Sequence, residues 1–206
     1  MLTQLIDIDS NLENALDIVS NGLPIAFPTE TVFGIGADIY NLSACEKIYD
    51  IKSRDVGKPL SAHVSSIEMA VSILLNPSDM FFKLAERFLP GPLAIISLKS
   101  QSVSDRITSG FDSISIRYPS NNTCLKFISA FGKPIAATSA NISGEPALGN
   151  SDEVFSKFSG TISGVIEGKC ELGTESTIIS IVGPPKLLRV GAIPKAEIED
   201  FLNIRL

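Results

Sequence analysis

The chain has 206 residues, 44% of them hydrophobic and 19% charged, and 17 basic against 23 acidic residues give it a formal net charge of −6. This composition excludes an intrinsically disordered chain and supplies enough apolar material for one sizeable core, so we expect a single domain over residues 1–206. The acidic balance also excludes a broad basic face for duplex nucleic acid, which needs many unopposed cations, but it is compatible with a local cationic pocket.

Cysteine usage and hydropathy indicate the cellular setting. Cys45, Cys124 and Cys170 are far apart and form no CxxC pair, so they predict neither a disulfide framework nor a zinc site. The N-terminus carries acids where a signal peptide would carry basic residues, and no apolar run approaches the roughly 18 residues of a membrane helix. We therefore expect a cytoplasmic protein with no membrane segment and no metal held by its own side chains.

Short apolar runs bounded by Pro, Gly or Ser alternate with amphipathic segments along the chain. In chain order, we predict strands at 23–27, 92–98, 113–118, 134–138, 176–182 and 186–190. We predict helices near 11–20, 43–52, 66–75, 79–88, 123–131, 151–158 and 195–202. The alternation indicates an α/β or α+β fold with a mixed sheet.

Three helix starts carry a recognisable signal. Residues 43–46 and 65–68 both match the capping box, in which a Ser and a Glu satisfy each other's free backbone amides. Pro194 suits the first turn of the last helix.

The segment "PTETVFGIG" at 28–36 directly follows a predicted strand. Its hydroxyls and carboxylate can face a ligand, and Gly34 and Gly36 would let backbone amides approach one closely. It lacks the third glycine of a dinucleotide fingerprint and the ending of a P-loop. On local pattern alone, an ordinary glycine-containing turn explains it equally well.

The segment "KSRDVGKPLSAH" at 52–63 concentrates cations in an acidic protein. Lys52 and Arg54 could simply complement the negative end of the preceding helix. Lys58 lies beyond that helix, and three cations at one helix–loop junction suit a triphosphate. His63, the single histidine, sits between apolar residues, a pattern more typical of a satisfied, partly buried side chain.

Later polar residues also lie on or just after predicted strands. Ser113, Ser115 and Arg117 alternate on one strand face, where an arginine can receive a carboxylate, although a solvated face explains the pattern as well. Hydroxyl and amide side chains follow the strand at 134–138, and they suit either a phosphate or purine ligand or turns that satisfy their own backbone; they are Ser139, Asn141 and Ser143. The segments "GTEST" and "LLRVGAI" add Ser176, Thr177 and Arg189.

Taken together and in order, the motifs PTETVFGIG, KSR with KPLSAH, PGPL, SIR, TSANISG, GTEST and LLRVGAI resemble the YrdC-like family of threonylcarbamoyl-AMP synthases over roughly residues 10–193. The resemblance implies a twisted mixed sheet flanked by helices around a large concave cavity. It implies a nucleotidyltransferase that makes threonylcarbamoyl-adenylate and pyrophosphate from L-threonine, bicarbonate and ATP, with Mg2+ arriving on the triphosphate. The chain resembles the short, single-domain form.

The resemblance also implies site residues. The catalytic signature of the family falls on Lys52, Arg54, Ser139 and Asn141. Its ATP contacts would be Arg54, Lys58, Ser113, Ser139, Ala147 and Arg189. Its threonine pocket would comprise Thr31, His63, Arg117, Ala137 and Ser176.

Lys52 and Arg54 would then stabilise the phosphates, and Arg117 would bind the threonine carboxylate. The product would pass to a tRNA threonylcarbamoyltransferase complex for modification of adenosine 37 in tRNAs that read ANN codons. We expect weak or no direct tRNA binding.

Two other functions remain open at this point. One is a paralogous enzyme of the same fold that acts on another carbamoyl or adenylate substrate, and the other is a non-catalytic RNA-binding module. The net charge of −6 argues against the module. Dependence of pyrophosphate release on both threonine and bicarbonate would separate the synthase from the paralogue.

Overall fold

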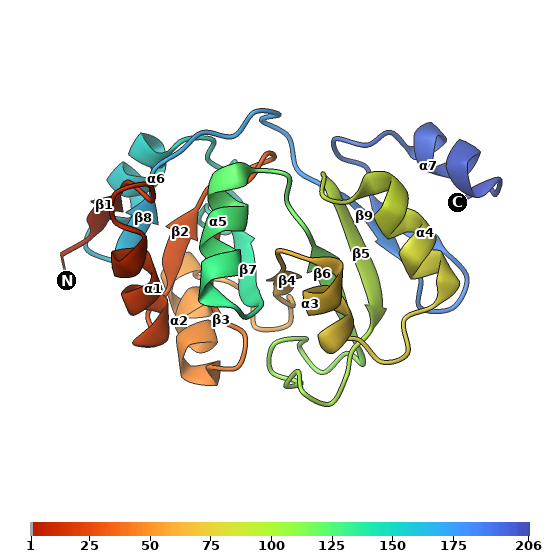
Figure 1. The fold of residues 1–206 in the computed structure, drawn as a ribbon, viewed down its shortest axis with the longest axis horizontal. Coiled ribbons are helices and arrows are strands. Elements are labelled where there is room, and N and C mark those ends of the chain that lie inside the picture. The colour runs from red at the N-terminus through yellow and green to blue at the C-terminus, as the bar shows by residue number, and fades with distance from the viewer. Residues whose placement is uncertain (1) are drawn as a thin grey trace.

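The computed structural model describes residues 2–206, so Met1 of the predicted domain lies outside the described part. Over that part, ten strands form one mixed sheet that helices cover on both sides (Figure 1). The strands are β1 (Gln4–Ile6), β2 (Ile25–Phe27), β3 (Gly34–Asp38), β4 (Ser61–His63), β5 (Leu93–Leu98), β6 (Ser113–Arg117), β7 (Ile135–Ser139), β8 (Gly164–Ile166), β9 (Thr177–Ser180) and β10 (Lys186–Arg189). The helices are α1 (Leu12–Ser20), α2 (Leu42–Lys52), α3 (Ile67–Ser72), α4 (Asp79–Phe88), α5 (Asn122–Phe131), α6 (Ser151–Phe158) and α7 (Lys195–Leu202).

The strand order is β1-β8-β2-β3-β7-β4-β6-β5-β9-β10. The central strands β3, β7 and β4 pair antiparallel, β4 and β6 pair parallel, and β6 and β5 pair antiparallel again. The expected mixed sheet with flanking helices is therefore confirmed. Strands from distant parts of the sequence meet at its centre, and this arrangement assembles the site described below.

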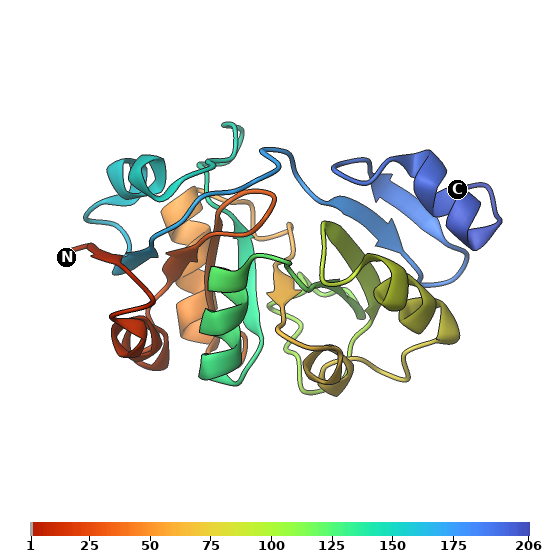
Figure 2. The same cartoon turned by 45° about the horizontal axis from the view of Figure 1, so that its top comes forward.

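Two clusters of buried apolar side chains hold the sheet and helices together. The smaller cluster joins α1 and α5 to β1, β2, β8 and part of β7, and in it the ring centroids of Phe27 and Phe127 lie 5.9 Å apart. The larger one gathers the apolar faces of α2, α3, α4, α6 and α7. Figures 1 and 2 show α1 and α5 side by side on one side of the sheet and α2 on the other.

All six predicted strands and all seven predicted helices are present, with ends shifted by a few residues. Four strands escaped prediction. Three of them, β1, β4 and β8, have only three residues each, too few to show an alternating pattern. The fourth, β3, begins in the segment 28–36, for which the sequence pattern left open a ligand-facing exit from a strand and a glycine-containing turn.

The glycines of β3 have a packing role that the loop interpretation missed. A Cβ at Gly36 would lie 2.5 Å from Ile135 Cγ2 and 2.9 Å from Ala137 Cβ. A Cβ at Gly34 would lie 3.1 Å from the ring of Phe27. Neighbouring side chains leave no room for a side chain at Gly36 and little at Gly34. Both glycines lie in β3, so the alternative of an ordinary glycine-containing turn is wrong at these two positions.

The predicted helix caps need small corrections. Asn41 caps α2 by accepting a hydrogen bond from the amide of Ala44 at 3.1 Å, which places Ser43 inside the helix. Ser66, rather than Ser65, caps α3 through the amide of Met69 at 3.1 Å. Pro194 occupies the cap position of α7, one residue before its first turn. Within residues 2–206, no helix has the length and apolar character needed to span a membrane.

Candidate active site

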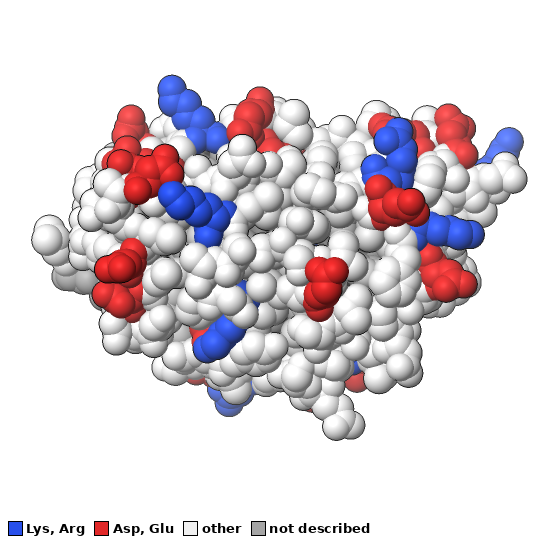
Figure 3. Space-filling model, in the orientation of Figure 1, with Lys and Arg blue, Asp and Glu red and all other residues white. Residues whose placement is uncertain are grey.

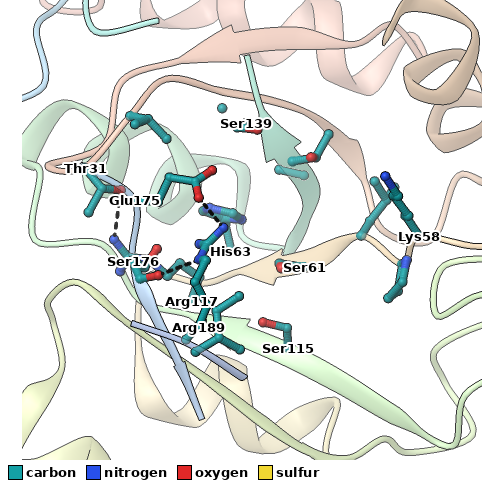
Figure 4. Close-up of a pocket in the computed structure, with 18 of the residues that line it drawn as sticks. Thr31, Lys58, Ser61, His63, Ser115, Arg117, Ser139, Glu175, Ser176 and Arg189 are labelled. Carbon is teal, nitrogen blue, oxygen red and sulfur yellow. Dashed lines mark hydrogen bonds and ion pairs between the residues drawn. The ribbon is translucent and has the colours of Figure 1, made fainter. Parts of the chain in front are cut away.

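A cavity of about 580 Å³ lies over one face of the central strands. Alternate residues of a strand share a face, and on β4, β5 and β6 the residues that line this cavity follow that rule, whereas on β7 Ala137, Thr138 and Ser139 all line it. Its floor is formed by side chains or backbone of Gly34, Ser61, His63, Ala94, Ile96, Ser115, Arg117, Ala137, Ser139 and Ile178. Its walls are formed by loop residues that include Thr31, Arg54, Lys58, Glu175 and Ser176, and by Arg189 at the end of β10 (Figure 4).

The register of the strands orders the floor into successive rows. His63 lies opposite Arg117, and two residues back along the parallel strands β4 and β6, Ser61 lies opposite Ser115. Because β7 runs antiparallel to β4 and Ser61 pairs with Ala137, Ser139 lies on the side of Ser61 that faces away from His63. We call the His63–Arg117 side, with Thr31 and Ser176, the carboxylate end. We call the opposite side, with Arg54, Lys58 and Ser139, the phosphate end.

Arg117 is the centre of the carboxylate end and is almost fully buried, with 3% of its side chain exposed. Its Nε donates to Ser176 Oγ at 3.0 Å, and its Nη2 lies 2.6 Å from Glu30 Oε1 and 3.5 Å from Thr31 Oγ1. Its Nη1 donates to the carbonyl of Gly91. These contacts hold the guanidinium plane in one orientation against the cavity.

His63 lines the same end and differs from the satisfied histidine that the local pattern favoured. Its ring is buried edge-on to Phe27, and its Nδ1 has no hydrogen-bond partner within residues 2–206. Burial and the neighbouring charge of Arg117 lower the pKa of His63 to about 3. The imidazole is therefore neutral at physiological pH and has a free nitrogen for a ligand.

The phosphate end begins where α2 stops. Ser53 ends the helix in the left-handed conformation, with φ of 49°, and the chain turns into the loop that carries Arg54 and Lys58. Arg54 fastens this loop, because its Nε and Nη2 donate to the carbonyls of Lys58 and Pro59 at 3.2 and 3.0 Å. These two bonds leave Nη1 available to a ligand in the cavity.

Lys52 lies beneath the cavity and does not line it. Its side chain is buried, and its Nζ donates to the carbonyl of Ser139, to Asn141 Oδ1 at 3.0 Å and to Thr138 Oγ1 at 3.5 Å. Burial, assisted by the charge of Arg54, lowers the pKa of Lys52 to about 7. The geometry differs from the expected direct contact with phosphate and makes Lys52 a support for the turn after β7.

Asn141 holds the same turn from the other side. Its Oδ1 accepts from Ser139 Oγ at 2.7 Å as well as from Lys52, and its Nδ2 donates to the carbonyl of Glu145 at 2.6 Å. Because Ser139 Oγ donates its hydrogen to Asn141, its lone pairs can still accept a hydrogen bond from a donor in the cavity.

Four cations line the cavity: Arg54, Lys58, Arg117 and Arg189. The lining also contains Glu175, which sequence reasoning did not single out and which pairs with Arg189 at 2.6 Å. Arg117 is also paired, with Glu30, so within residues 2–206 Arg54 and Lys58 are the cations of the lining that form no ion pair with a carboxylate. Figure 3 shows acidic and basic side chains interspersed on the face it displays, in contrast to this concentration.

The expected site residues thus fall into two groups. Those that line the cavity are Thr31, Arg54, Lys58, His63, Arg117, Ala137, Ser139, Ser176 and Arg189. Lys52, Ser113, Asn141 and Ala147 lie outside its lining. Glu175 was overlooked, and its proximity to Ser176 in the sequence was the available signal. The carboxylate of Glu30, expected to face a ligand, pairs with Arg117 and lies outside the lining.

The mixed sheet, with arginine and lysine side chains lining one cavity on its face, defines the class: an α/β protein with a pocket suited to an anionic small molecule. A family model named Sua5_yciO_yrdC and described as "Telomere recombination" matches residues 17–191. The chain belongs to this Sua5/YciO/YrdC family.

Individual relatives agree with the family assignment. The chain is 37% identical to a threonylcarbamoyl-AMP synthase of Pyrococcus abyssi, covering 98% of this chain but 62% of that protein. It is 32% identical to one from Vibrio parahaemolyticus, covering 88% of this chain and 99% of that protein. The crystal structure of P. abyssi Sua5 complexed with L-threonine superposes with a TM-score of 0.93 at 36% identity, covering 100% of this chain and 62% of that one. The structure of Escherichia coli YciO shares the fold, with a TM-score of 0.83 at 21% identity.

Proposed function

We propose that the chain is a threonylcarbamoyl-AMP synthase, which converts L-threonine, bicarbonate and ATP into threonylcarbamoyl-adenylate and pyrophosphate. The observation that carries the proposal is the cavity with a carboxylate end around Arg117 and a phosphate end around Arg54 and Lys58 on one sheet face. The names of the relatives and the threonine complex of P. abyssi Sua5 support it.

At the carboxylate end, Arg117 would bind the carboxylate of threonine. Ser176 and Thr31, which already contact the guanidinium, would complete the receptor. The neutral His63 would accept a hydrogen bond from the hydroxyl or amine of threonine at its free Nδ1. A site that bonds a substrate hydroxyl discriminates strongly against an analogue that lacks it, so valine would be a poor substrate.

At the phosphate end, Arg54 and Lys58 would neutralise the triphosphate, and Arg189 would join them after leaving Glu175. Ser139 would accept a hydrogen bond from a substrate donor close to the α-phosphate, because its own proton is bonded to Asn141. Lys52 and Asn141 would act as positioning residues that hold Ser139 in place. Catalysis then consists mainly of orientation and charge neutralisation.

The proposed reaction has two steps, formation of a carbamate and its transfer to the α-phosphorus. The amine nitrogen of threonine forms a bond to the carbon of bicarbonate, which loses its hydroxyl as water with a proton from the amine, and a carbamate results. A carbamate oxygen then forms a bond to the α-phosphorus of ATP while the bond to pyrophosphate breaks. The first step takes place beside the carboxylate end, and the second joins the carbamate to the α-phosphate at the phosphate end of the same cavity.

Mg2+ belongs to the proposal as a companion of the triphosphate. Within residues 2–206 no group of three or more His, Cys, Asp or Glu side chains could hold a metal, and the cavity lining offers the single carboxylate of Glu175. Such a lining fits a cation that keeps waters and is held chiefly by phosphates. When bound, Mg2+ would neutralise charge on the leaving pyrophosphate.

We place the reaction in the cytoplasm, which supplies ATP and suits the three free cysteine thiols. The site draws its lining from Thr29 to Arg189, so we propose that one domain carries it. The product would pass to a tRNA threonylcarbamoyltransferase complex that modifies adenosine 37 of tRNAs reading ANN codons, with weak or no direct tRNA binding by this chain.

Pyrophosphate release from ATP tests the proposal when threonine and bicarbonate are omitted in turn. We expect release only when both are present. Release that is indifferent to threonine would contradict it and would favour a paralogous activity on another substrate.

A further inference from the structure

Two serine hydroxyls on the cavity floor have no role in the function described so far. Ser61 of β4 and Ser115 of β6 lie opposite each other in the parallel register, and both line the cavity. Ser115 Oγ is buried and has no hydrogen-bond partner within residues 2–206. An unpartnered buried hydroxyl costs free energy, so its retention at the floor of a binding cavity points to a ligand.

The position of this pair between the two ends is fixed by the strand register. The next row along β4 and β6 in one direction holds His63 and Arg117 of the carboxylate end. In the other direction lie the loop of Lys58 and, on β7, Ser139 of the phosphate end. Rows of same-face residues are about 7 Å apart along a strand, so the pair lies one row from each end. Figure 4 shows Ser61 and Ser115 between Lys58 on one side and Arg117 on the other.

The residues beside Ser61 and Ser115 on the adjacent strands are apolar, so only the two serines can bond a polar group in this row. Ser61 is flanked by Ala137 of β7, and Ser115 is flanked by Ile96 of β5. Neither flanking side chain can donate or accept a hydrogen bond. A polar group placed over this row would therefore find only the hydroxyls of Ser61 and Ser115 on the floor beneath it.

The proposed reaction identifies the polar group that would lie over Ser61 and Ser115. With threonine held at the carboxylate end and the α-phosphate at the phosphate end, the one unit between them is the carbon with its oxygens that comes from bicarbonate. This unit is an anion as bicarbonate and as carbamate, but it is neutral once esterified to AMP. Neutral hydroxyls can bond its oxygens in all three states, whereas a buried cation would be left unpaired in the last.

We propose that Ser61 and Ser115 form the subsite for bicarbonate and for the carbamate made from it. The subsite rests on the proposed function. Ser115 donates to one oxygen of the planar CO2 unit, and Ser61 contacts the same unit from the adjacent strand. The two serines orient its carbon toward the threonine amine and an oxygen toward the α-phosphorus, and they take no part in bond making or breaking.

The test measures pyrophosphate release as a function of bicarbonate in buffers depleted of CO2, for the unsubstituted chain and for Ser115→Ala and Ser61→Ala. Losing a hydrogen bond to a charged group corresponds to about a ten- to hundredfold change, so we expect the KM for bicarbonate to rise by that factor in Ser115→Ala. The KM for threonine and the affinity for ATP should stay within about twofold. Ser97→Ala is the matched control, because Ser97 is a buried serine next to Ile96 on β5 and does not line the cavity.

The melting temperature separates a binding role from a folding role. Removing an unpartnered buried hydroxyl leaves no broken hydrogen bond, so Ser115→Ala should melt no lower than the unsubstituted chain. An unchanged KM for bicarbonate in both serine variants would overturn the subsite, and so would a rise confined to the KM for threonine. Absence of any bicarbonate dependence in the unsubstituted chain would instead overturn the proposed function itself.

Discussion

Arg117 Nη2 lies 2.6 Å from Glu30 Oε1, and both side chains are buried, at 3% and 6% exposure. The charge of Arg117 is therefore already balanced by Glu30 before a substrate binds, and the orientation of its guanidinium is fixed because Glu30 bonds its Nη2. A substrate carboxylate that arrives at this end meets an oriented guanidinium, which lowers the entropic cost of forming the bond.

Glu30→Gln tests this pairing through stability. Removing one partner of a buried ion pair leaves an uncompensated charge, so we expect the free energy of unfolding to fall by about 3–5 kcal/mol. Urea unfolding measures the change. Glu197→Gln is the control: it breaks the exposed pair with Arg87 and should cost about 0.5 kcal/mol or less. Equal effects of the two substitutions would show that the buried pair is not what holds Arg117.

Arg117→Ala tests the recognition of threonine. We expect threonine binding to weaken by at least tenfold, because a charged hydrogen-bond donor to the carboxylate is lost. Titration calorimetry should find the affinity for ATP largely kept. Arg106→Ala removes an arginine that pairs with Glu46 at the surface, and it should leave both affinities unchanged. Unchanged threonine affinity in Arg117→Ala would remove this residue from the threonine site.

The lowered pKa of His63 leads us to expect that the stability of the protein depends on pH. The pKa of the folded state, about 3, lies below the ordinary value of 6.5, so the unfolded chain binds the proton more readily. The contribution of His63 is therefore complete above pH 6.5 and is lost as the pH falls toward 3. At pH 5 the loss amounts to about 2 kcal/mol. His63→Gln should remove this part of the difference in unfolding free energy between pH 7 and pH 5, and an identical difference in both proteins would contradict a neutral buried imidazole.

The sequence predicted the strands and helices well where a pattern had room to show. Apolar runs such as 92–98 and 113–118 are long enough to reveal a buried strand, whereas the three-residue strand β4 that carries His63 is not. The glycines of β3 concealed a strand because their role depends on Ile135 and Ala137, about a hundred residues away.

The site was harder to predict than the helices and strands, because its contacts also join residues that are distant in the sequence. Motifs identified most of the residues that line the cavity, but they could not reveal side-chain partners. Lys52 meets Asn141 across 89 positions, and Arg117 meets Glu30 across 87. Only the folded sheet shows that Lys52 supports the turn after β7 from below and that Glu30 pairs with Arg117.

Lys52→Met tests the difference between support and contact. Without the Nζ donor, the Ser139 carbonyl and Asn141 lose the hydrogen bonds that hold their turn, and we expect kcat to fall about a hundredfold with the KM for threonine unchanged. Arg54→Ala, which removes a cavity-lining cation, should lower kcat by a similar factor and also weaken ATP binding. Equal loss of ATP affinity in Lys52→Met would contradict its role as a positioning residue.

Glu175→Gln tests the pairing that occupies Arg189 at 2.6 Å. A half-exposed ion pair contributes about 1 kcal/mol or less, so releasing Arg189 should strengthen ATP binding by about two- to fivefold. Titration of the nucleotide with and without Mg2+ measures the effect. Weaker binding that appears only with Mg2+ would contradict this expectation and would show that the carboxylate serves the cation.

The most direct measurement follows the carbon of bicarbonate. The chain is incubated with ATP, Mg2+, L-threonine and [13C]bicarbonate, and the products are analysed by mass spectrometry. We expect a threonylcarbamoyl-adenylate that carries one 13C, disappears when threonine is omitted, and is lost in Arg54→Ala and Arg117→Ala. Cleavage of ATP to AMP and pyrophosphate without a labelled adduct would contradict it.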